Sequence, residues 1–174
     1  RVSAEYGTNV LIKDGEVVIA SFVFDAAFDA SDGVLDNFGV VTLSLGEGPH
    51  PLSVEATDTA GNRSQSDVLL VTIDYTAPLA ASIALAPYSD SGTAGDGITN
   101  VAAPAFSGVA EANALVRLYV DDGKGAVLAG QAYVHDDESD GAASNGLGIW
   151  EITVEPLRDG QYTVWVEVED QAGN

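Results

Sequence analysis

An internal repeat constrains the fold of this chain more than any other feature. The segment LSVEATDTAGN at residues 52–62 reappears as VWVEVEDQAGN at residues 164–174, 112 positions further along. Two more pairs of segments match in the same order at spacings of 108 and 109 positions: residues 10–15 with 118–123, and residues 39–43 with 148–152. Three matches in one order predict a duplicated domain whose copies differ in the lengths of their loops.

Short segments rich in β-branched and aromatic residues predict strands rather than helices. Residues 161–169 show the clearest pattern, because Tyr162, Val164, Val166 and Val168 alternate with the side chains between them. Turn dipeptides such as DG separate these segments. We expect further strands at residues 81–85, 105–109, 115–120, 126–133 and 148–154, and a closing strand of the first copy at residues 68–74. The pattern predicts an all-β fold of antiparallel sandwiches.

The repeat also predicts where the domains divide. We expect a first sandwich at residues 1–76 and a second at residues 77–174, joined by a short linker in which Pro78 restricts the backbone. The first copy begins at the equivalent of residues 115–120, and the second stops before a closing strand. We therefore expect the chain to be a window on a longer tandem array.

The charge balance limits the possible partners. The chain has 27 acidic and 6 basic residues, for a formal net charge of −21. Such a surface repels nucleic-acid phosphates and anionic lipids, so we expect neither as a partner. No apolar run reaches the roughly 18 residues of a membrane-spanning helix, so we expect no membrane insertion. The acidic excess favours either simple solvation or the binding of divalent cations, and there are no cysteines to form disulfides.

Three motifs follow one another around the linker: DTAGN at residues 58–62, IDYTAP at residues 73–78 and DSGTAGDGITN at residues 90–100. In this order they resemble the bacterial immunoglobulin-like repeats of giant RTX-type adhesins, which Gram-negative bacteria export by type I secretion. The similarity covers nearly the whole chain, although the first copy has no visible counterpart of residues 90–100.

The resemblance implies two tandem immunoglobulin-like antiparallel β-sandwiches, joined end to end and stiffened by calcium (Ca2+) at the junction. It implies an extracellular spacer on the bacterial cell surface whose partners are the neighbouring repeats of the same polypeptide. Other regions of such a protein would contact a host, surface or biofilm ligand.

Acidic residues near the motifs are the candidate calcium ligands, because calcium prefers six to eight oxygen atoms from carboxylates, amides and carbonyls. If repeats stack end to end, Asp58, Asn62 and Asp74 lie at the pole that faces the second copy, where Asp122 or its neighbour Asp121 would complete the site. Asp170 is the repeat equivalent of Asp58. The alternative is that these aspartates only stabilise turns.

Two further loops are acidic. Asp90 and Asp96 bracket a glycine-rich loop followed by Asn100, and calcium or an ordinary turn would both use this pattern. Asp136, Glu138 and Asp140 alternate like the start of an EF-hand loop, but Leu147 stands where the closing glutamate would be. A solvated loop is therefore the default there. The first copy carries acidic residues at the corresponding position: Asp25, Asp29, Asp32 and Asp36.

Nothing in the sequence predicts an enzyme, since no nucleophile elbow, phosphate loop or zinc spacing is present. His50 and His135 are not at ligand spacing. The alternatives to a spacer are a carbohydrate- or protein-binding module, or an accessory domain of a secreted carbohydrate-active enzyme. Either would show an exposed aromatic cluster or cleft on one domain only, whereas Trp150 and Trp165 in strands favour core or partly covered positions. Strand exchange between molecules is a third possibility.

Overall fold

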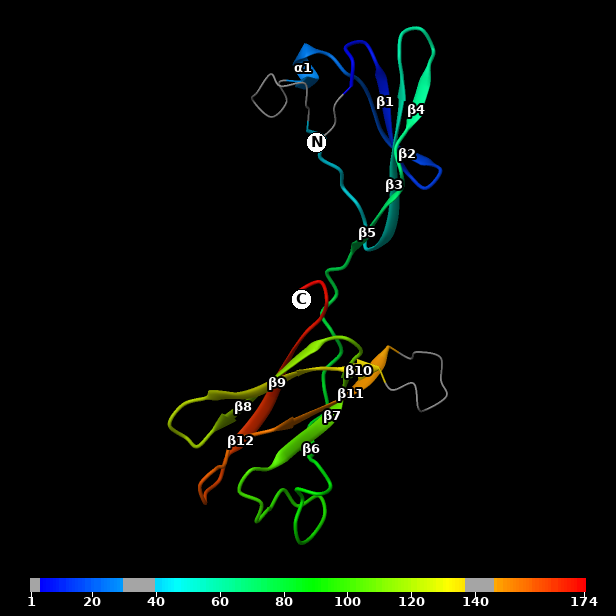
Figure 1. The fold of residues 1–174 in the computed structure, drawn as a ribbon. Helices are drawn as coiled ribbons and strands as arrows, with labels where there is room; N and C mark the ends of the chain where they lie inside the picture. The colour runs from blue at the N-terminus through cyan, green and yellow to red at the C-terminus, as the bar shows by residue number, and fades with distance from the viewer. Residues whose placement is uncertain (1–3, 30–39, 137–145) are drawn as a thin grey trace. The chain divides into compact units, whose positions relative to one another are not determined.

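The computed structural model describes residues 4–29, 40–136 and 146–174 (Figure 1). The chain divides into two compact units, Arg1–Asp74 and Tyr75–Asn174, which we call unit 1 and unit 2. The division falls two residues before the boundary that the sequence predicts. Every strand pairing described is antiparallel, which confirms the predicted all-β class. The described residues include no helix with the length and hydrophobicity that a membrane crossing requires.

The described residues of unit 1 form one five-stranded sheet. Its strands run in the order β2-β1-β3-β4, and β5 pairs with the same edge of β3 as β4 does. The single helix described, α1, has its first turn capped by Asp25, whose Oδ1 accepts from the backbone N–H groups of Ala27 and Phe28. The elements are β1 (Asn9–Asp14), β2 (Val17–Val23), α1 (Ala26–Asp29), β3 (Gly48–Thr57), β4 (Arg63–Gln65) and β5 (Leu69–Ile73).

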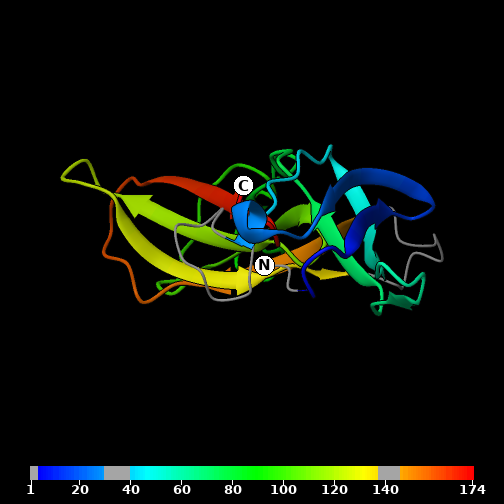
Figure 2. The same ribbon diagram turned by 90° about the horizontal axis from the view of Figure 1, so that it is seen from above.

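Unit 2 is a sandwich of two antiparallel sheets, as the sequence predicts. One sheet has the order β10-β11-β7-β6, and the other has the order β12-β8-β9. Figure 2 shows the second sheet as red, yellow-green and yellow strands lying side by side. The strands are β6 (Ala84–Leu85), β7 (Ala105–Glu111), β8 (Leu115–Asp121), β9 (Val127–Tyr133), β10 (His135–Asp136), β11 (Leu147–Thr153) and β12 (Thr163–Glu169).

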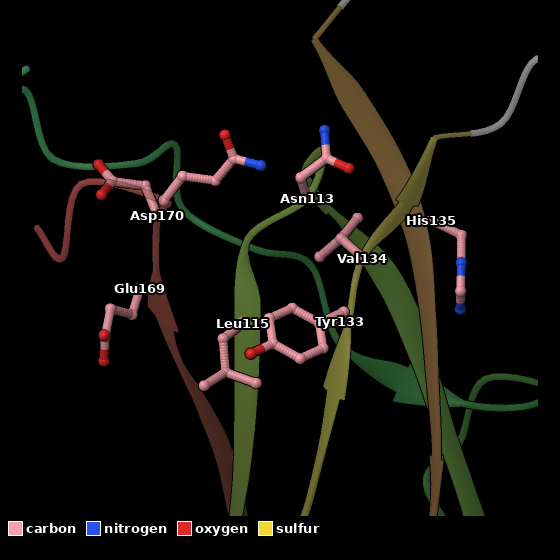
Figure 3. A pocket seen from close by; sticks show the side chains of 8 residues that line it. Asn113, Leu115, Tyr133, Val134, His135, Glu169 and Asp170 are labelled. Carbon is pink, nitrogen blue, oxygen red and sulfur yellow. The ribbon is translucent and has the colours of Figure 1, made fainter. Parts of the chain in front are cut away.

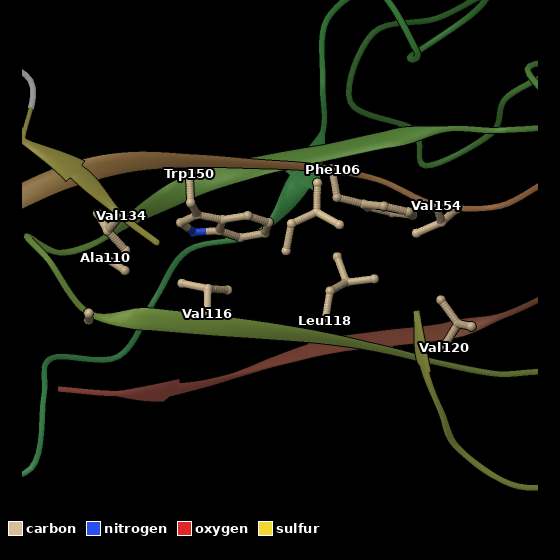
Figure 4. Close-up of a cluster of buried hydrophobic side chains, with 10 residues drawn as sticks. Phe106, Ala110, Val116, Leu118, Val120, Val134, Trp150 and Val154 are labelled. Carbon is tan, nitrogen blue, oxygen red and sulfur yellow. The ribbon is translucent and has the colours of Figure 1, made fainter. Parts of the chain in front are cut away.

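The hydrophobic core of unit 2 lies between its two sheets (Figure 4). Val116, Leu118 and Val120 alternate along β8 and point inward, because successive side chains of a strand lie on opposite faces. Trp150 of β11 is only 2% exposed, which confirms the expectation of a core position for this tryptophan. Within the described residues, its Nε1 has no hydrogen-bond partner.

Both units contain the same arrangement of three strands, which in unit 1 is part of the five-stranded sheet, and this arrangement gives the register of the repeat. β1 lies between β2 and β3 as β8 lies between β9 and β12, and both hairpins carry an irregularity: one between Ile12 and Lys13, the other between Leu118 and Tyr119. This feature makes Ile12 equivalent to Leu118, so the strands correspond at a spacing of 106 rather than 108 positions. The sequence match aligns the DG turns at residues 14–15 and 122–123 instead. These turns differ in length, because two residues connect the paired strands in the first hairpin and six connect them in the second.

One pair of matched segments differs in structure between the units. Residues 148–152 belong to β11, but residues 40–43, their counterparts in unit 1, belong to no strand. β11 pairs along its whole length with β7, and the described residues of unit 1 contain no strand in the place of β7.

Candidate functional site

The candidate ligands of unit 2 lie at opposite ends of its sandwich. We call the end that contains the turn from β7 to β8 the entry pole, because the chain arrives there from the linker and Ser82 donates its backbone N–H to the Val109 carbonyl. Asp170 lies at this pole, since it follows the pairing of Glu169 with Leu115. The far pole holds the loop of residues 90–100, which precedes β7, and the turn from β8 to β9.

The loop of residues 170–174 closes on itself around the carboxylate of Asp170. Its Oδ1 accepts from the backbone N–H groups of Ala172, Gly173 and Asn174 at 2.8–2.9 Å, and its Oδ2 accepts from Asn174 Nδ2 at 3.0 Å. The hydrogen bond from the Asn174 side chain, followed by those from the loop backbone, lowers the pKa of Asp170.

The equivalent loop of unit 1 has the same geometry. Asp58 Oδ1 accepts from Ala60 N and Asn62 N, and its Oδ2 accepts from Asn62 Nδ2 at 2.7 Å. The Asn62 side chain is again the largest cause of a lowered pKa, here that of Asp58. Both loops therefore show the turn that was the alternative to calcium, and calcium coordination by Asp58, Asn62 and Asp170 stays a prediction.

Asp170→Asn is expected to destabilise unit 2 and to weaken its dependence on acid pH. The new amide nitrogen faces the Nδ2 donor of Asn174, so we expect the melting temperature to fall by roughly 5 °C at neutral pH. In the native chain the folded-state pKa of Asp170 lies below the unfolded value of about 3.9. The loop's contribution is therefore complete above that value and is lost as the pH falls through the folded-state pKa.

Calorimetry between about pH 7 and pH 3 measures this difference. Asp159→Asn is the matched control, because Asp159 is an exposed acidic residue of the same unit. If the two variants have the same stability at every pH, the loop makes no contribution through its charge.

In unit 1, Asp58 and Asp74 lie at opposite ends of β3. Ile73 pairs with Gly48, the first residue of this strand, whereas Asp58 follows Thr57, the last. A strand of ten residues is roughly 30 Å long at about 3.3 Å per residue. The prediction that Asp58, Asn62 and Asp74 share one pole is therefore wrong. The cause is that β4 and β5 pair with successive halves of β3, which brings the chain back to the start of that strand.

Asp122 lies at the far pole of unit 2, so the expectation that it faces the linker is wrong. Its carboxylate is engaged by Lys124, with 2.6 Å between Oδ2 and Nζ, and this hydrogen bond is the largest cause of its lowered pKa. Asp121 Oδ1 accepts from the backbone N–H groups of Gly123 and Gly125. Both aspartates thus stabilise the hairpin turn.

The loop of residues 90–100 combines tight turns with one unsatisfied carboxylate oxygen. Asp90 Oδ2 accepts from Gly95 N at 2.6 Å, and Asp96 Oδ1 accepts from Ile98 N at 2.8 Å. The backbone N–H of Asn100 donates to Ser91 Oγ. Asp90 Oδ1 is buried and has no hydrogen-bond partner within the described residues. A buried carboxylate oxygen without a donor indicates an unfilled position for a proton donor or a cation.

The base of this loop is fixed to the sandwich. Ser89 is buried, its Oγ accepts from Ala105 N at the start of β7, and its carbonyl accepts from Thr99 Oγ1. Gly92, Gly95 and Gly97 have φ angles of 82°, 81° and 72°, in the left-handed region that glycine adopts without strain. The sequence therefore folds locally into a compact loop held against the strand that follows it.

The remaining acidic candidates form no cluster that the structure describes. Glu138 and Asp140 lie outside the described residues, and Asp136 is in β10, where only its backbone is described. In the described parts of the chain, no group of three or more histidine, aspartate or glutamate side chains is placed to hold a metal ion. A calcium site in these parts of the chain would therefore need amide and carbonyl oxygens in addition to carboxylates.

A cavity at the entry pole was not predicted from the sequence. Its volume is about 590 Å³, and Figure 3 shows Leu115 and Tyr133 beside it. It brings together the ends of β8, β9 and β12, which are distant in sequence, and no local pattern marks it. The carboxylate of Glu169 forms an ion pair with Arg117, with 2.7 Å between Oε2 and Nη1. The lining residues are Asn113, Leu115, Tyr133, Val134, His135, Glu169, Asp170 and Gln171.

An aromatic pair lies on the outer face of the β12-β8-β9 sheet. Trp165 and Tyr119 are cross-strand partners whose rings stack at 5.4 Å between centroids and 12° between planes. Both side chains are partly buried, and the positions that correspond to them in unit 1 hold Ser53 and Lys13. The pair stabilises the sheet by cross-strand stacking. An aromatic pair and a cavity on one unit are features that a ligand-binding module would also have.

Comparison with known families agrees with this fold. The family described as Bacterial Ig-like domain matches residues 76–174, which span unit 2 from its second residue onward. No curated protein matches the chain. Domains of this family are common in extracellular and surface proteins and are typically not catalytic. Because the match covers more than half of the residues, the chain belongs to the bacterial Ig-like domain family.

Proposed function

We propose that this chain is an extender segment of a large bacterial cell-surface adhesin, that it lies outside the cell, and that it has no catalytic activity. The observation that carries the proposal is the arrangement of three strands that occurs in both units, each time followed by a self-closed Asp-x-x-Gly-Asn loop. Repetition of one module is how long surface proteins gain length. The partners are then the neighbouring repeats, while other regions contact the host, surface or biofilm ligand.

Calcium is the second part of the proposal, and the loop of residues 90–100 supports it best. Asp90 Oδ1 is the unsatisfied oxygen there, and Asp96 and Asn100 supply further oxygen atoms within the same loop. Filling this position would relieve a buried acceptor and tie the loop more firmly to β7. Ligation by Asp74 at the linker stays a separate prediction, because Asp58 and Asn62 do not accompany Asp74.

Calcium is expected to stabilise unit 2. At about 10 mM calcium, sites with dissociation constants of about 10⁻⁴–10⁻³ M stabilise the folded state by about 1.4–2.7 kcal/mol. This corresponds to a rise in melting temperature of roughly 5–20 °C relative to EDTA. Asp90→Asn should remove most of the rise, whereas Asp159→Asn should keep it. Calorimetry with magnesium at equal ionic strength separates specific binding from screening.

Equal melting temperatures in calcium and EDTA would show that the calcium proposal is wrong.

The extender proposal has its own test, because a spacer binds no ligand through its surface. We expect no signal on a glycan array, and Trp165→Ala should leave that result unchanged. Binding that Trp165→Ala abolishes would instead establish the stacked pair as a carbohydrate platform and would overturn the extender role.

A further inference from the structure

Each unit has a short segment at which the chain turns into β3 or β12, and one side chain closes this turn. We call residues 46–50 and 158–162 the corners of unit 1 and unit 2. In unit 2 the hydroxyl of Tyr162 donates to the carbonyl oxygen of Arg158 at 3.1 Å. A tyrosine bonded back to the preceding loop in this way is a recurrent feature of immunoglobulin-like sandwiches. The bond needs one donor hydrogen, which phenols keep up to about pH 10.

Unit 1 has a histidine at the equivalent position of its corner. The spacing of 112 positions that relates β3 to β12 makes His50 equivalent to Tyr162 and Gly46 equivalent to Arg158. His50 Nε2 lies 2.9 Å from the carbonyl oxygen of Gly46, so the histidine closes the same turn. Its other ring nitrogen, Nδ1, lies 2.5 Å from Asp14 Oδ2. Both ring nitrogens therefore face acceptor atoms.

Only the imidazolium form of His50 satisfies both contacts. A neutral imidazole carries one N–H, so one of its nitrogens would present a lone pair to a carboxylate or carbonyl oxygen. The pair is largely shielded from solvent, with side-chain exposures of 14% for His50 and 24% for Asp14. The hydrogen bond to Asp14, followed by the bond to the Gly46 carbonyl, raises the pKa of His50. The corner of unit 1 thus requires a titratable proton, whereas a phenol closes the corner of unit 2.

The charged groups around His50 favour the same protonated form. Asp14 lies on the same face of the sheet as His50, because its ladder partner is two residues along β3 from the histidine. Lys13, the basic residue of β1, lies on the opposite face with its Nζ in an ion pair. On the other side of β3, β5 has no charged residue. The described charged residues that flank the strands at this end of the sheet are acidic: Glu16, Glu47 and Asp74.

The corner holds the part of β3 that pairs with β5. Gly48 pairs with Ile73 and Leu52 pairs with Leu69, so the ladder to β5 lies within the first half of β3. β5 is the last strand before the linker. Loss of the bond at His50 frees the start of β3 and weakens the ladder that fixes β5.

We propose that His50 and Asp14 make the corner of unit 1 a pH-sensitive device, which is closed while the imidazole is protonated and opens when that proton is lost. Its contribution to stability is complete below the unfolded-state value of about 6.5 and is lost as the pH rises through the folded-state pKa, which is higher. The strand that leads to the linker is therefore held more firmly in mildly acidic surroundings than in alkaline ones. The consequence for an extender, a more flexible end of unit 1 at higher pH, rests on the proposed function; the corner itself does not.

Asp14→Asn is the sharpest test, because an asparagine can complete the corner with a neutral imidazole. Its amide N–H can donate to Nδ1 while Nε2–H still donates to the Gly46 carbonyl. His50→Tyr introduces the residue that unit 2 has at this position, and Asp14→Asn carries the test alone if the larger ring disturbs unit 1. His135→Gln is the matched control, because His135 is an exposed histidine of unit 2.

The experiment uses the full chain in EDTA, so that calcium makes no contribution. Imidazole ¹⁵N chemical shifts report the proton on each ring nitrogen, and His135→Gln assigns the signals of the two histidines. His50 should keep both protons at a pH at which the Asp14→Asn variant has lost one.

Amide hydrogen exchange measures the opening of the corner, as protection relative to an unstructured peptide at the same pH. Between about pH 5.5 and about pH 9 we expect protection of residues 48–52 and 69–73 to fall at least about threefold in the native chain. The same amides should change by less than about 1.5-fold in Asp14→Asn and His50→Tyr. His135→Gln should behave as the native chain does, and the amides of β8 in unit 2 are the internal reference.

The proposal is overturned if His50 loses its proton at the same pH in the native chain as in Asp14→Asn, or at a lower one. Constant protection of residues 48–52 in the native chain would also overturn it, as would an equal fall in the native chain and in Asp14→Asn. None of these outcomes depends on calcium or on an extender role, so the corner and the proposed function fail separately.

Discussion

Replacing Trp150 with alanine is expected to lower the free energy of unfolding of unit 2 by about 3–5 kcal/mol. The indole is 2% exposed and lies between the two sheets, among Ala110, Val116 and Val134 (Figure 4). Its removal leaves a cavity that neighbouring side chains on paired strands fill only in part. Urea unfolding, followed by the fluorescence of the remaining Trp165, measures the loss.

Two comparisons test whether burial is the cause. Trp165→Ala removes the same side chain from the partly exposed outer face, so it should cost about 1–2 kcal/mol. Trp150→Phe removes the Nε1 donor, which has no partner in the described structure, and should therefore cost much less than alanine. An equal loss for Trp150→Ala and Trp165→Ala would contradict the core position.

Gly108→Ala has the second-largest expected effect, a destabilisation of about 3 kcal/mol or more. A Cβ atom added at this position would lie 1.9 Å from the carbonyl oxygen of Ser82 and 3.0 Å from Cε2 of Trp150. The first of these atoms belongs to the backbone, so the substitution must move the segment before β6 away from β7. Thermal unfolding measures the loss, and increased amide exchange at Ser82 and Ala84 locates it.

Gly160→Ala is the matched control in the same unit. Its added Cβ would have its nearest neighbour at 3.8 Å, and its φ angle lies outside the left-handed region. We expect a change within about 0.5 kcal/mol. If the two alanine variants are equally stable, close approach of the chain at Ser82 does not explain why residue 108 is glycine.

The sandwich of unit 2 could be predicted because its strands carry their own pattern. Alternation along residues 161–169 and the turn dipeptides between strands are local signals, and local signals set strand positions to within a few residues. Pairing register is not local. The sequence match aligns Ile12 with Val120, whereas the strand pairings make Ile12 equivalent to Leu118, two residues earlier. The cause is that the two DG turns resemble each other more than the strands beside them do.

The candidate site could be predicted only in part, for a similar reason. Sequence identifies residues 58–62 and 170–174 as equivalent loops, and the structure gives them equivalent hydrogen bonds. The sequence does not show that β4 and β5 pair with the same edge of β3, an arrangement that separates Asp58 from Asp74. Nor does it show which oxygen of Asp90 is buried without a partner, since burial depends on the packing of the whole loop.

The self-closed loops have a consequence for how such a chain can lengthen. Every hydrogen bond described for Asp170 joins it to residues within the same five-residue segment, and the same holds for Asp58. Such a loop can be duplicated together with the strand before it, because its hydrogen bonds require no residue elsewhere in the chain to change. The DTAGN and DQAGN segments accordingly have equivalent hydrogen bonds, although the hairpins of the neighbouring strands differ in length.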